Sequence, residues 1–238
     1  MKFLLNNKTV ELAGLIAGDG YLHKSCNRII VTGSLDDLYY YENYIIPIFI
    51  KSFNITPKLY KRKGKNAYDL QIENKNVFSF FVNELGMIRG SKKNRVLIPD
   101  KIIKNKEFSK NFIRGLFDTD GCLKFSKQTK NFNYYPRIQI YCHKSPMCDQ
   151  IRLVLDRLKF NYSLYKNKSK GNVFVYELSG FLNLEKWSNI IGSSNPVNIS
   201  KFIFIKKKGF YQPYLTLIER LNILNLSIKN ILKEKLFK

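Results

Sequence analysis

The sequence predicts an α+β protein made of two pseudo-symmetric halves, each with the element order αββαββα. Two observations lead to this prediction. The segments 12–20 and 113–121 resemble each other at a spacing of 101 residues, and each precedes the same succession of strand-like and helix-like stretches. A period near 100 residues is too long for a solenoid and therefore indicates duplication of a whole domain.

Hydrophobic periodicity and turn residues place the individual elements. In the first half, a helix ending near residue 18 precedes a strand at 28–32, a helix at 38–53, paired strands at 57–63 and 68–73, and a helix at 77–85. In the second half, a helix ending near residue 120 precedes a strand at 137–141, a helix at 147–160, paired strands at 163–168 and 173–178, and a helix at 184–191. Turn residues at 64–66 and 169–172 join the paired strands.

The expected domains are a first half-domain at 1–91, a basic linker at 92–106, a second half-domain at 107–200 and a C-terminal helical extension at 201–238. The extension has apolar residues at alternating steps of four and three: Leu217, Leu221, Leu224, Ile228 and Ile231. This spacing predicts one apolar face of a helix within 214–238, which we expect to pack on the second half.

Composition favours a folded protein that binds a polyanion. The 238 residues include 41 Lys and Arg against 18 Asp and Glu, a net charge of +23, while 45% hydrophobic residues suffice for a packed core. No run approaches the ~18 apolar residues of a membrane span, and the opening MKFLLNN is too short for a secretory signal. The four cysteines lack CxxC spacing, so neither a zinc ribbon nor a disulfide framework is indicated. We therefore expect an intracellular nucleic-acid-binding protein without a membrane partner.

The two repeated helices carry small residues on one stripe. Gly14 and Gly18 lie four apart, and Gly115 and Thr119 repeat that spacing. A glycine inside a helix costs about 0.5–1 kcal/mol relative to alanine, so its presence needs a reason. Close packing of the two helices supplies one, because helix separation depends on the bulk at the contact.

Both helices also carry expected capping residues. Thr9 or a nearby Asn is expected to cap the first, with Glu11 in the first turn where the helix dipole favours an anion. Ser109 is expected to cap the second, and Phe108 with Ile113 has the spacing of a hydrophobic staple.

An acidic residue ends each helix. Asp19 and Asp120 stand directly before Gly20 and Gly121, which we interpret as left-handed residues that terminate the helices. A carboxylate beside the carbonyls of a helix C-terminus is disfavoured by ~0.3–1 kcal/mol, and a divalent cation reverses the sign of this interaction. The sequence therefore predicts a metal site at the two helix ends. Asp118, on nearly the opposite side of its helix, is expected to have a local role.

The two nonapeptides resemble the signature of the LAGLIDADG homing endonucleases, in the single-chain type with two motifs. The first matches seven of nine letters, departing at Ala17 and Gly18, and the second keeps Gly115, Leu116, Asp118, Asp120 and Gly121. The resemblance implies antiparallel, saddle-like sheets that lie in the DNA major groove and an interface between the motif helices. It also implies that Asp19 and Asp120 bind the catalytic metal, with the carbonyls of Gly18 and Thr119 as secondary ligands. Mg²⁺ is the expected ion, and Ca²⁺ or Mn²⁺ could occupy the same sites.

The supporting residues depart from the family pattern. Family members often place Gln or Lys on the second strand of each half, where this chain has Gly33 and Cys142. Some have a catalytic lysine on the fourth strand, near which this chain has Gln71 and Glu177. The candidate supporting lysines are Lys92, Lys93 and Lys124.

The predicted function is that of a site-specific, intron-encoded endonuclease that cuts double-stranded DNA by metal-assisted hydrolysis of one phosphodiester per strand. Because the halves differ, we expect a monomer and a long, partly palindromic target. The residues expected to contact DNA are Tyr21, His23, Arg28, Lys61, Lys63, Tyr68, Gln71, Lys124, Ser126, Gln128, Arg137, Gln139, Tyr165 and Asn167. His23 and His143 are interpreted as DNA contacts or surface residues. An RNA maturase that assists splicing by binding intron RNA is an alternative, and a non-enzymatic DNA-binding regulator is another. An intein is disfavoured, since the chain lacks splicing blocks.

Overall fold

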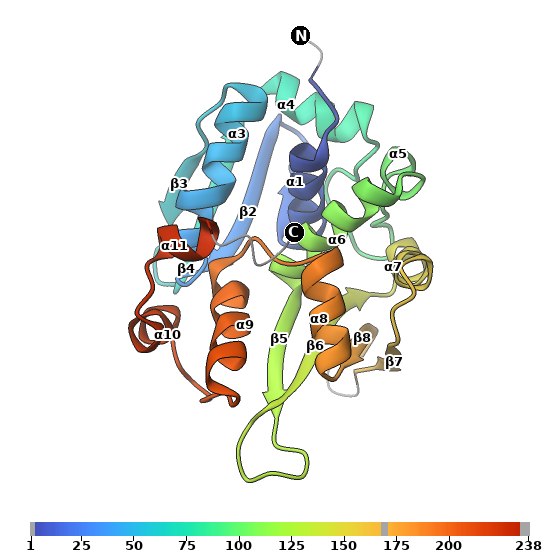
Figure 1. Cartoon of the computed structure of the whole chain (residues 1–238). Coiled ribbons are helices and arrows are strands. Elements are labelled where there is room, and N and C mark those ends of the chain that lie inside the picture. The colour runs from blue at the N-terminus through green and yellow to red at the C-terminus, as the bar shows by residue number, and fades with distance from the viewer. Residues whose placement is uncertain (1–2, 168–170, 234–238) are drawn as a thin grey trace.

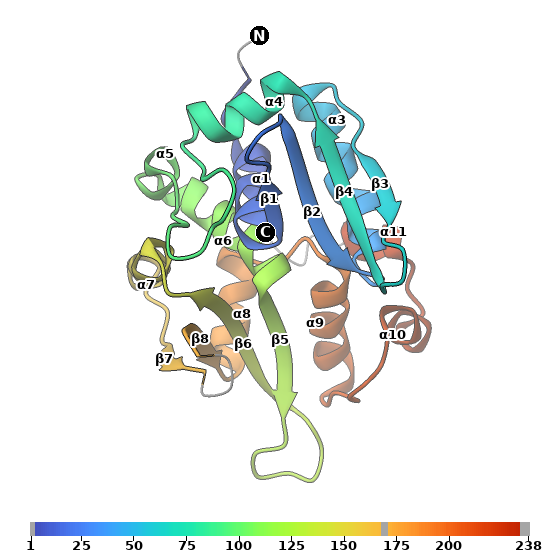
Figure 2. The same cartoon turned by 180° about the vertical axis from the view of Figure 1, so that it is seen from behind.

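The computed structural model describes residues 3–167 and 171–233 and contains two four-stranded antiparallel sheets with helices on one side of each (Figures 1 and 2). The strand orders are β1-β2-β4-β3 and β5-β6-β8-β7, so the second half repeats the topology of the first. The predicted α+β fold with two pseudo-symmetric halves is confirmed.

The first half consists of one motif helix, one sheet and the helices that cover it. Its helices are α1 (Asn7–Gly18), α2 (Leu38–Tyr40), α3 (Ile46–Phe53) and α4 (Lys75–Ser79), and π-helical segments η1 (Tyr41–Ile45) and η2 (Phe80–Glu84) follow α2 and α4. Its strands are β1 (Gly20–Leu22), β2 (Arg28–Ser34), β3 (Lys58–Lys61) and β4 (Ala67–Glu73). The helix expected at 38–53 is therefore continuous but contains a π-helical turn.

The second half begins after a short helix, α5 (Asp100–Ile103), and is followed by three further helices. It contains α6 (Lys106–Asp120), β5 (Gly121–Ser126), β6 (Tyr135–His143), α7 (Pro146–Arg157), β7 (Ser163–Lys166), β8 (Val173–Ser179) and α8 (Phe181–Ile190). The C-terminal helices are α9 (Pro196–Lys208), α10 (Leu217–Leu224) and α11 (Ile228–Lys233). Residue 168 of an expected strand and residues 169–170 of an expected turn lie outside the described residues, as do residues 234–238 of the expected tail helix.

Helices α1 and α6 pack with their backbones in direct contact. A Cβ atom placed on Gly14 would lie 2.9 Å from the carbonyl carbon of Phe112, and one on Gly115 would lie 2.8 Å from the amide nitrogen of Leu15. Neither position has room for a methyl group, because the nearest atoms belong to the facing backbone. The prediction that small residues allow close packing of the repeated helices is confirmed.

The caps of both helices are asparagines. The Asn6 side chain accepts from the amides of Lys8 and Thr9, and Thr9 completes a capping box, so of the two candidates the nearby Asn is the cap. Asn105 caps α6 by accepting from the amides of the second and third helical residues. The prediction of Ser109 as the cap is wrong because α6 begins earlier, and Ser109 Oγ instead donates to the carbonyl of Ile102 (3.1 Å).

Two related predictions fail for the same reason. Phe108 lies inside the first turn of α6, so it cannot form the expected staple with Ile113. Glu11 lies beyond the first turn of α1 and is fully buried. Its carboxylate accepts from Tyr44 Oη (2.9 Å) and from Ser194 Oγ (2.5 Å), so it joins the first half to the segment before α9.

The glycines after the motif helices are required for space and not for a left-handed backbone. Gly121 has φ −107° and ψ 167°, and Gly20 is also without a positive φ, so the interpretation of both as left-handed residues is wrong. Each glycine instead begins a strand. A Cβ on Gly20 would lie 2.5 Å from Ile16 Cα, and one on Gly121 would lie 2.9 Å from Phe117 Cα. The sharp turn from helix to strand therefore excludes any side chain.

The segment expected as a linker, 92–106, packs against the second half. The carbonyl of Val96 accepts from the amide of Met147 (3.0 Å). The backbone N–H of the buried Ile98 donates to the side-chain oxygen of Gln150, whose side-chain nitrogen donates to the carbonyl of Ile98 (3.0 Å). Lys92 of the same segment donates to carbonyls at the end of α1, so the segment contacts both halves.

The C-terminal extension forms two helices after α9 instead of the single predicted helix. Asn225 adopts a left-handed conformation (φ 52°) and ends α10. Leu217, Leu221, Leu224 and Ile231 nevertheless form one buried cluster with α9. Because α9 begins at residue 196, the boundary expected at 200/201 falls inside a helix. Within the described residues, no helix has both the length and the apolarity to cross a bilayer.

Each sheet has one face covered by helices and one open face. In β2, Ile29 and Val31 are buried in the core, whereas Arg28, Ile30 and Thr32 point to the other side and are partly exposed. In Figure 2 the strands of both sheets lie in front of α3, α8 and α9, so the two open faces lie on the same side of the molecule. This arrangement forms an extended surface on which the motif helices end.

Candidate active site and nucleic-acid interface

The C-terminal ends of α1 and α6 lie in contact, and each carries one carboxylate. Gly18 is the last residue of α1 and Asp19 follows it, while Asp120 is the last residue of α6. A Cβ on Gly18 would lie 3.0 Å from Thr119 Cβ and 3.2 Å from Asp120 Oδ2. The close packing of the glycine-bearing helices therefore brings together two acidic residues that lie 101 positions apart in the sequence.

Both carboxylates are held in an environment that disfavours their charge. Burial of the carboxylate, followed by the charges of Asp120 and Asp37, raises the pKa of Asp19 to about 7, although part of the residue is exposed to solvent. Burial also raises the pKa of Asp120, against the positive charges of Lys92 and His143. The site thus concentrates negative charge that a bound cation would stabilise.

A lysine from the segment between the halves supplies one cation at this site. Lys92 Nζ donates to the carbonyls of Ile16 (3.3 Å), Ala17 (2.8 Å) and Gly18, which lie in the last turn of α1. Burial lowers the pKa of Lys92, and the charges of Asp120 and Asp19 oppose this shift. The sequence predicts a divalent cation at the helix ends, whereas the structure also places the Lys92 ammonium group at the end of α1.

A cavity of about 300 Å³ opens beside the two helix ends. Its walls include Gly18, Asp120, Lys93, His143 and Cys142. Within the described part of the chain, no group of three His, Cys, Asp or Glu side chains is placed to hold a metal. Asp120 lines this cavity, whereas Asp19 lies outside its wall at the adjoining end of α1. Their carboxylates and the nearby backbone carbonyls are hard oxygen ligands of the kind that fits Mg²⁺, Mn²⁺ or Ca²⁺ with water completing the coordination.

Asp118 binds the segment before α9 and is not part of the cavity. Its buried carboxylate accepts from Ser193 Oγ and from the amide of Ser194 (2.7 Å), and its carbonyl accepts from Asn195 Nδ2 (3.2 Å). Burial raises the pKa of Asp118 to about 7, while these two hydrogen bonds to the carboxylate lower it. Asp118 is therefore a structural anchor on the other side of the helix from Asp120.

The remaining supporting candidates occupy different places. Lys93 lines the cavity, whereas Lys124 lies on β5 opposite Arg137, away from the helix ends. Cys142 lines the cavity, and a Cβ on Gly33 would lie 2.9 Å from Asp37 Oδ2. Of the three candidate lysines, Lys92 has the contacts expected of a residue that supports the site.

The open face of the first sheet carries a cross-strand row of four residues. The row runs across β1, β2, β4 and β3 and consists of Tyr21, Ile30, Gln71 and Lys58, each paired with the next. Of the other residues expected here, Arg28 pairs with Glu73, and His23 contacts the ring of Tyr21 at a centroid distance of 5.7 Å. These placements put Tyr21, His23, Arg28 and Gln71 on one surface.

Three other expected residues of the first half lie elsewhere. Tyr68 is opposite Gly33 and points to the covered face, and Lys61 is its partner on β3. Lys63 is exposed in the turn between β3 and β4. Because side chains alternate between the two faces of a strand, Lys58 and Tyr60 lie exposed on the open face in place of the expected Lys61 and Lys63.

The open face of the second sheet carries a hydrogen-bonded polar network. Arg137 and Gln139 donate to the Glu177 carboxylate, and Tyr165 Oη donates to it at 3.1 Å. Burial raises the pKa of Glu177, but the hydrogen bonds from Gln139 and Arg137 outweigh this and lower it overall. Gln139 is only 1% exposed and accepts from Tyr141 Oη (2.6 Å), so its amide is committed within the protein.

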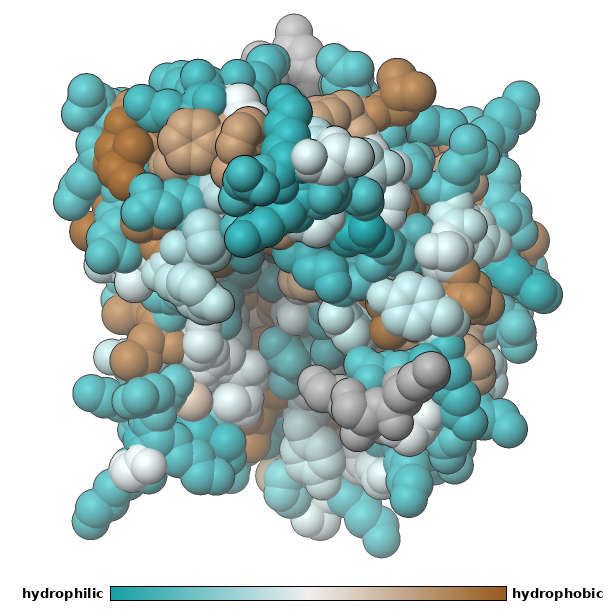
Figure 3. Space-filling view, turned by 90° about the horizontal axis from the view of Figure 1, so that it is seen from below, coloured by the Kyte–Doolittle hydropathy of each residue, from teal (hydrophilic) through white to brown (hydrophobic). Residues whose placement is uncertain are grey.

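The remaining expected residues of the second half lie at the edges of this face. Lys124 is exposed, and Ser126 Oγ accepts from Arg137 (3.1 Å). Gln128 is exposed in the loop after β5 with a left-handed backbone (φ 49°), and Asn167 follows β7 with its amide bonded to the carbonyl of Val173. Seen from below, hydrophilic side chains surround a hollow in the middle of the molecule (Figure 3).

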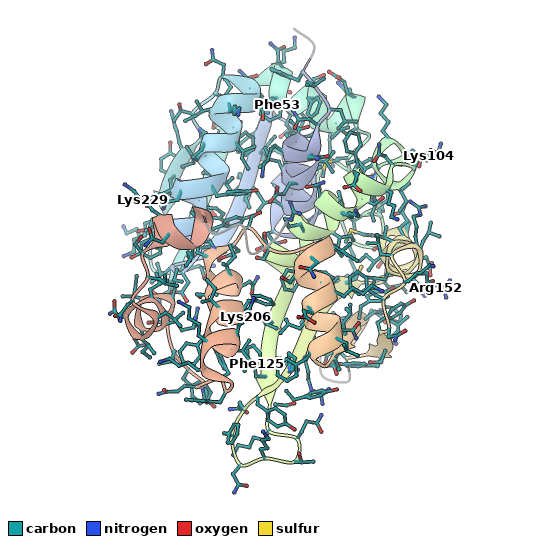
Figure 4. The ribbon with its side chains drawn as sticks, viewed as in Figure 1. Phe53, Lys104, Phe125, Arg152, Lys206 and Lys229 are labelled. Atoms are coloured by element: carbon teal, nitrogen blue, oxygen red, sulfur yellow. The ribbon has the colours of Figure 1, made fainter. Side chains whose placement is uncertain are left out.

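The positive charge is not confined to the open faces. Lys104, Arg152 and Lys229 are exposed and project from opposite sides of the molecule (Figure 4). The basic residues behind the net charge of +23 are therefore spread over several sides of the molecule. What distinguishes the open faces is the row of alternating polar side chains on their strands.

A family model described as a LAGLIDADG-like domain matches residues 107–226, about half of the chain. The homing endonuclease I-DmoI of Desulfurococcus mucosus is 24% identical over 189 residues, which cover 73% of this chain and 84% of that protein. A solved structure of I-DmoI in complex with DNA and Mn has a TM-score of 0.54 at 21% identity and covers 78% of this chain and 96% of that one.

A second relative matches over a shorter part of its own length. The Replication factor C small subunit of Methanocaldococcus jannaschii is 35% identical over 129 residues, which are 50% of this chain and 7% of that protein. The chain therefore corresponds to a small part of that relative.

Proposed function

The chain belongs to the LAGLIDADG-like family, and from this premise we propose that it is a site-specific endonuclease of double-stranded DNA. The observation that carries the proposal is the contact between two helix ends, each with one carboxylate, at the centre of a surface formed by two open sheet faces. One chain supplies two acidic residues, which matches the two phosphodiesters that a double-strand cut requires.

Asp19 and Asp120 would hold divalent metal, for which Mg²⁺ is our proposal. The environment supports this, because burial disfavours the charge of both carboxylates, and the charge of Asp120 further disfavours that of Asp19. The carbonyl of Thr119 could serve as a further ligand, whereas that of Gly18 is already an acceptor for Lys92. A divalent cation bound there would supply charge stabilisation at the scissile phosphate. A solved structure of I-DmoI is a complex with DNA and Mn, which supports the choice of a divalent ion.

The protein groups around the carboxylates would position them and attract the phosphate. Lys92 holds the carbonyls at the end of α1 and thereby fixes the direction in which Asp19 leaves the helix. Lys93 and His143 line the same cavity as Asp120, so basic residues border the place proposed for the phosphate. None of these roles requires a covalent nucleophile or a histidine base.

Duplex DNA would lie along the two open sheet faces. In the first half we assign Tyr21, His23, Arg28, Gln71, Lys58 and Tyr60 to this contact, and in the second half Lys124, Ser126, Gln128, Arg137, Tyr165 and Asn167. Lys61, Lys63, Tyr68 and Gln139 are less suitably placed in the free protein. Since the two faces carry different residues, the target would be long and only partly palindromic, and one chain would act as a monomer.

The gene context belongs to the same proposal. We propose that the protein is intron-encoded and that its target is the uninterrupted host sequence. Cleavage is the primary function in this proposal, because both motif acids are present and meet, whereas assistance to splicing does not require them.

The test is cleavage of DNA that spans the uninterrupted host locus, with Mg²⁺ and without it. We expect Asp19→Asn and Asp120→Asn each to abolish double-strand cleavage, while Asp100→Asn leaves it unchanged, since Asp100 is an exposed acid that pairs with Lys104 (3.6 Å). Cleavage that survives both motif substitutions would reject the proposed site. If the parent protein does not cleave the DNA but stimulates splicing of its host intron, the maturase function would be favoured over the nuclease function.

A further inference from the structure

Two cysteines from different elements lie side by side beneath the second sheet. Cys142 is near the end of β6 and Cys148 is in the first turn of α7, and their Sγ atoms are 3.0 Å apart. Both side chains are buried, with 2% and 8% of their surfaces exposed. The other two cysteines, Cys26 and Cys122, have no such neighbour among the contacts described.

The geometry around the pair is close to that of a disulfide. A disulfide has an S–S distance of about 2.05 Å, so the two sulfur atoms need to approach by only about 1 Å. The intervening turn is short and held by Ser145 Oγ, which donates to the carbonyl of His143 (2.9 Å). Cys148 Sγ also lies 3.1 Å from that carbonyl, so both thiols belong to one compact turn.

Each thiol faces a different hollow. Cys148 lines a cavity of about 690 Å³ whose wall includes Lys144 and Asn172, and this cavity opens to solvent. Cys142 lines the cavity that also contains Asp120 and Lys93. Of the two thiols, Cys148 is the more exposed (8% against 2%) and lines the open cavity, so a reagent would approach from its side, while Cys142 lies in the wall of the candidate active site.

The local chemistry favours Cys148 as the first thiol to react. The hydrogen bond shared by the two thiols lowers the pKa of Cys148 and raises the pKa of Cys142. Cys148 also stands at the N-terminal end of the 12-residue helix α7, where the helix dipole favours a thiolate. Lys144 in the cavity wall would attract an anionic reagent, and Asp149 in the same wall opposes this attraction in part.

We propose that Cys142 and Cys148 form a redox modification site whose substrate is a small anionic disulfide of the glutathione type. The Cys148 thiolate attacks one sulfur of the reagent, which forms a mixed disulfide and releases one glutathione thiolate. The Cys142 thiol then loses its proton, and its thiolate attacks Cys148 Sγ, which forms the intramolecular disulfide and expels the second glutathione. Two protein thiols are oxidised by two electrons, and one glutathione disulfide is reduced to two thiols.

The bond would also alter the turn that contains His143. Oxidation removes the hydrogen of Cys148 and hence its contact with the His143 carbonyl, and it draws β6 toward α7. This change lies next to Asp120 in the cavity wall but does not depend on the protein being a nuclease, so the site can be tested without any DNA substrate.

The test is mass spectrometry of the folded Cys26→Ser, Cys122→Ser protein after exposure to oxidised glutathione, acid quench and alkylation of remaining thiols. The expected product has lost two hydrogen atoms, carries no glutathione and takes up no alkylating reagent. With Cys142→Ser added, Cys148 should instead retain one glutathione, and with Cys148→Ser added, Cys142 should react much more slowly.

Peptide mapping of the oxidised wild-type chain keeps the test valid if these variants fail to fold. The expected linkage joins Cys142 to Cys148 and is reversed by a dithiol reductant. Persistence of the mixed disulfide at Cys148 in the presence of Cys142, or full alkylation of both thiols after the same exposure, would overturn the proposal.

Discussion

Replacing Gly115 by alanine tests whether the contact between the motif helices determines both stability and activity. The new methyl carbon would lie 2.8 Å from the amide nitrogen of Leu15 and closer still to the carbonyl oxygen of Glu11, whereas ordinary contact begins at 3.4 Å. The two backbones must therefore separate by more than 0.6 Å. Overpacking of this kind costs about 1–3 kcal/mol, and the better helix propensity of alanine returns at most about 1 kcal/mol. The two ranges leave a net loss of up to about 2.5 kcal/mol, centred on about 1 kcal/mol, which corresponds to about 2–4 °C in Tm for a chain of this length.

The same displacement separates Asp19 from Asp120 at the helix ends. Misplacement of catalytic groups by about 1 Å can lower a rate by about 10², so we expect single-turnover DNA cleavage by Gly115→Ala to fall at least tenfold. Gly209→Ala is the control, because Gly209 has open space around its Cβ position but a left-handed backbone (φ 73°) at the end of α9. It should lower Tm by a similar amount and leave the cleavage rate unchanged. An unaltered Tm for Gly115→Ala, or an equal loss of cleavage in Gly209→Ala, would refute this reasoning.

Three further outcomes are expected. Lys92→Met should lower Tm by about 2–8 °C, since a charge-assisted hydrogen bond contributes about 1.5–3 kcal/mol before the cost of burying the charge is subtracted. Lys93→Met removes no described hydrogen bond to α1 and should change Tm little. Equal shifts of the two variants in thermal denaturation would contradict the role of Lys92. Lys58→Ala should flatten the slope of log binding constant against log salt by about 0.9 if Lys58 contacts one phosphate, and Lys61→Ala, on the other face of the same strand, should leave the slope unchanged. The pKa of Glu177 is lower in the folded than in the unfolded protein, so its ionised carboxylate stabilises the fold at neutral pH, and this stabilisation is lost as the pH falls below about 4.5. Between pH 7 and pH 3 the free energy of unfolding, measured with denaturant, should therefore fall less for Glu177→Gln than for the parent.

The fold and the acidic pair followed from the sequence because both rest on local patterns. The repeated nonapeptides fixed the positions of Asp19 and Asp120, and the glycine spacing required close helices. Helix starts were less accessible, because several polar residues near 105–109 could act as caps and only the folded backbone shows that Asn105 does so. Glu11 could not be recognised as a buried residue, since its partners Tyr44 and Ser194 lie far away in the sequence.

The candidate site was incomplete for a related reason. Lys92 was one of three equivalent candidates in a lysine-rich chain, and what distinguishes it is the path of the segment between the halves past the end of α1. Strand faces were also sensitive to small errors, because a shift of one residue in β3 exchanges Lys58 and Tyr60 for Lys61. Periodicity alone does not fix that register, whereas the ladder between β3 and β4 does.

The segment that connects the two halves supports the end of α1, so the two halves are not interchangeable in engineered hybrids. Lys92 serves the end of α1, while the corresponding stretch after the second half supplies Ser193 and Ser194, which bind Asp118 instead. A homodimer built from two copies of the second half would bring two Asp120 residues together without any counterpart of Lys92. Chimaeras that exchange half-domains with other members of the family therefore need to keep Lys92 with the first half, while Val96 and Ile98 stay with their partners in the second.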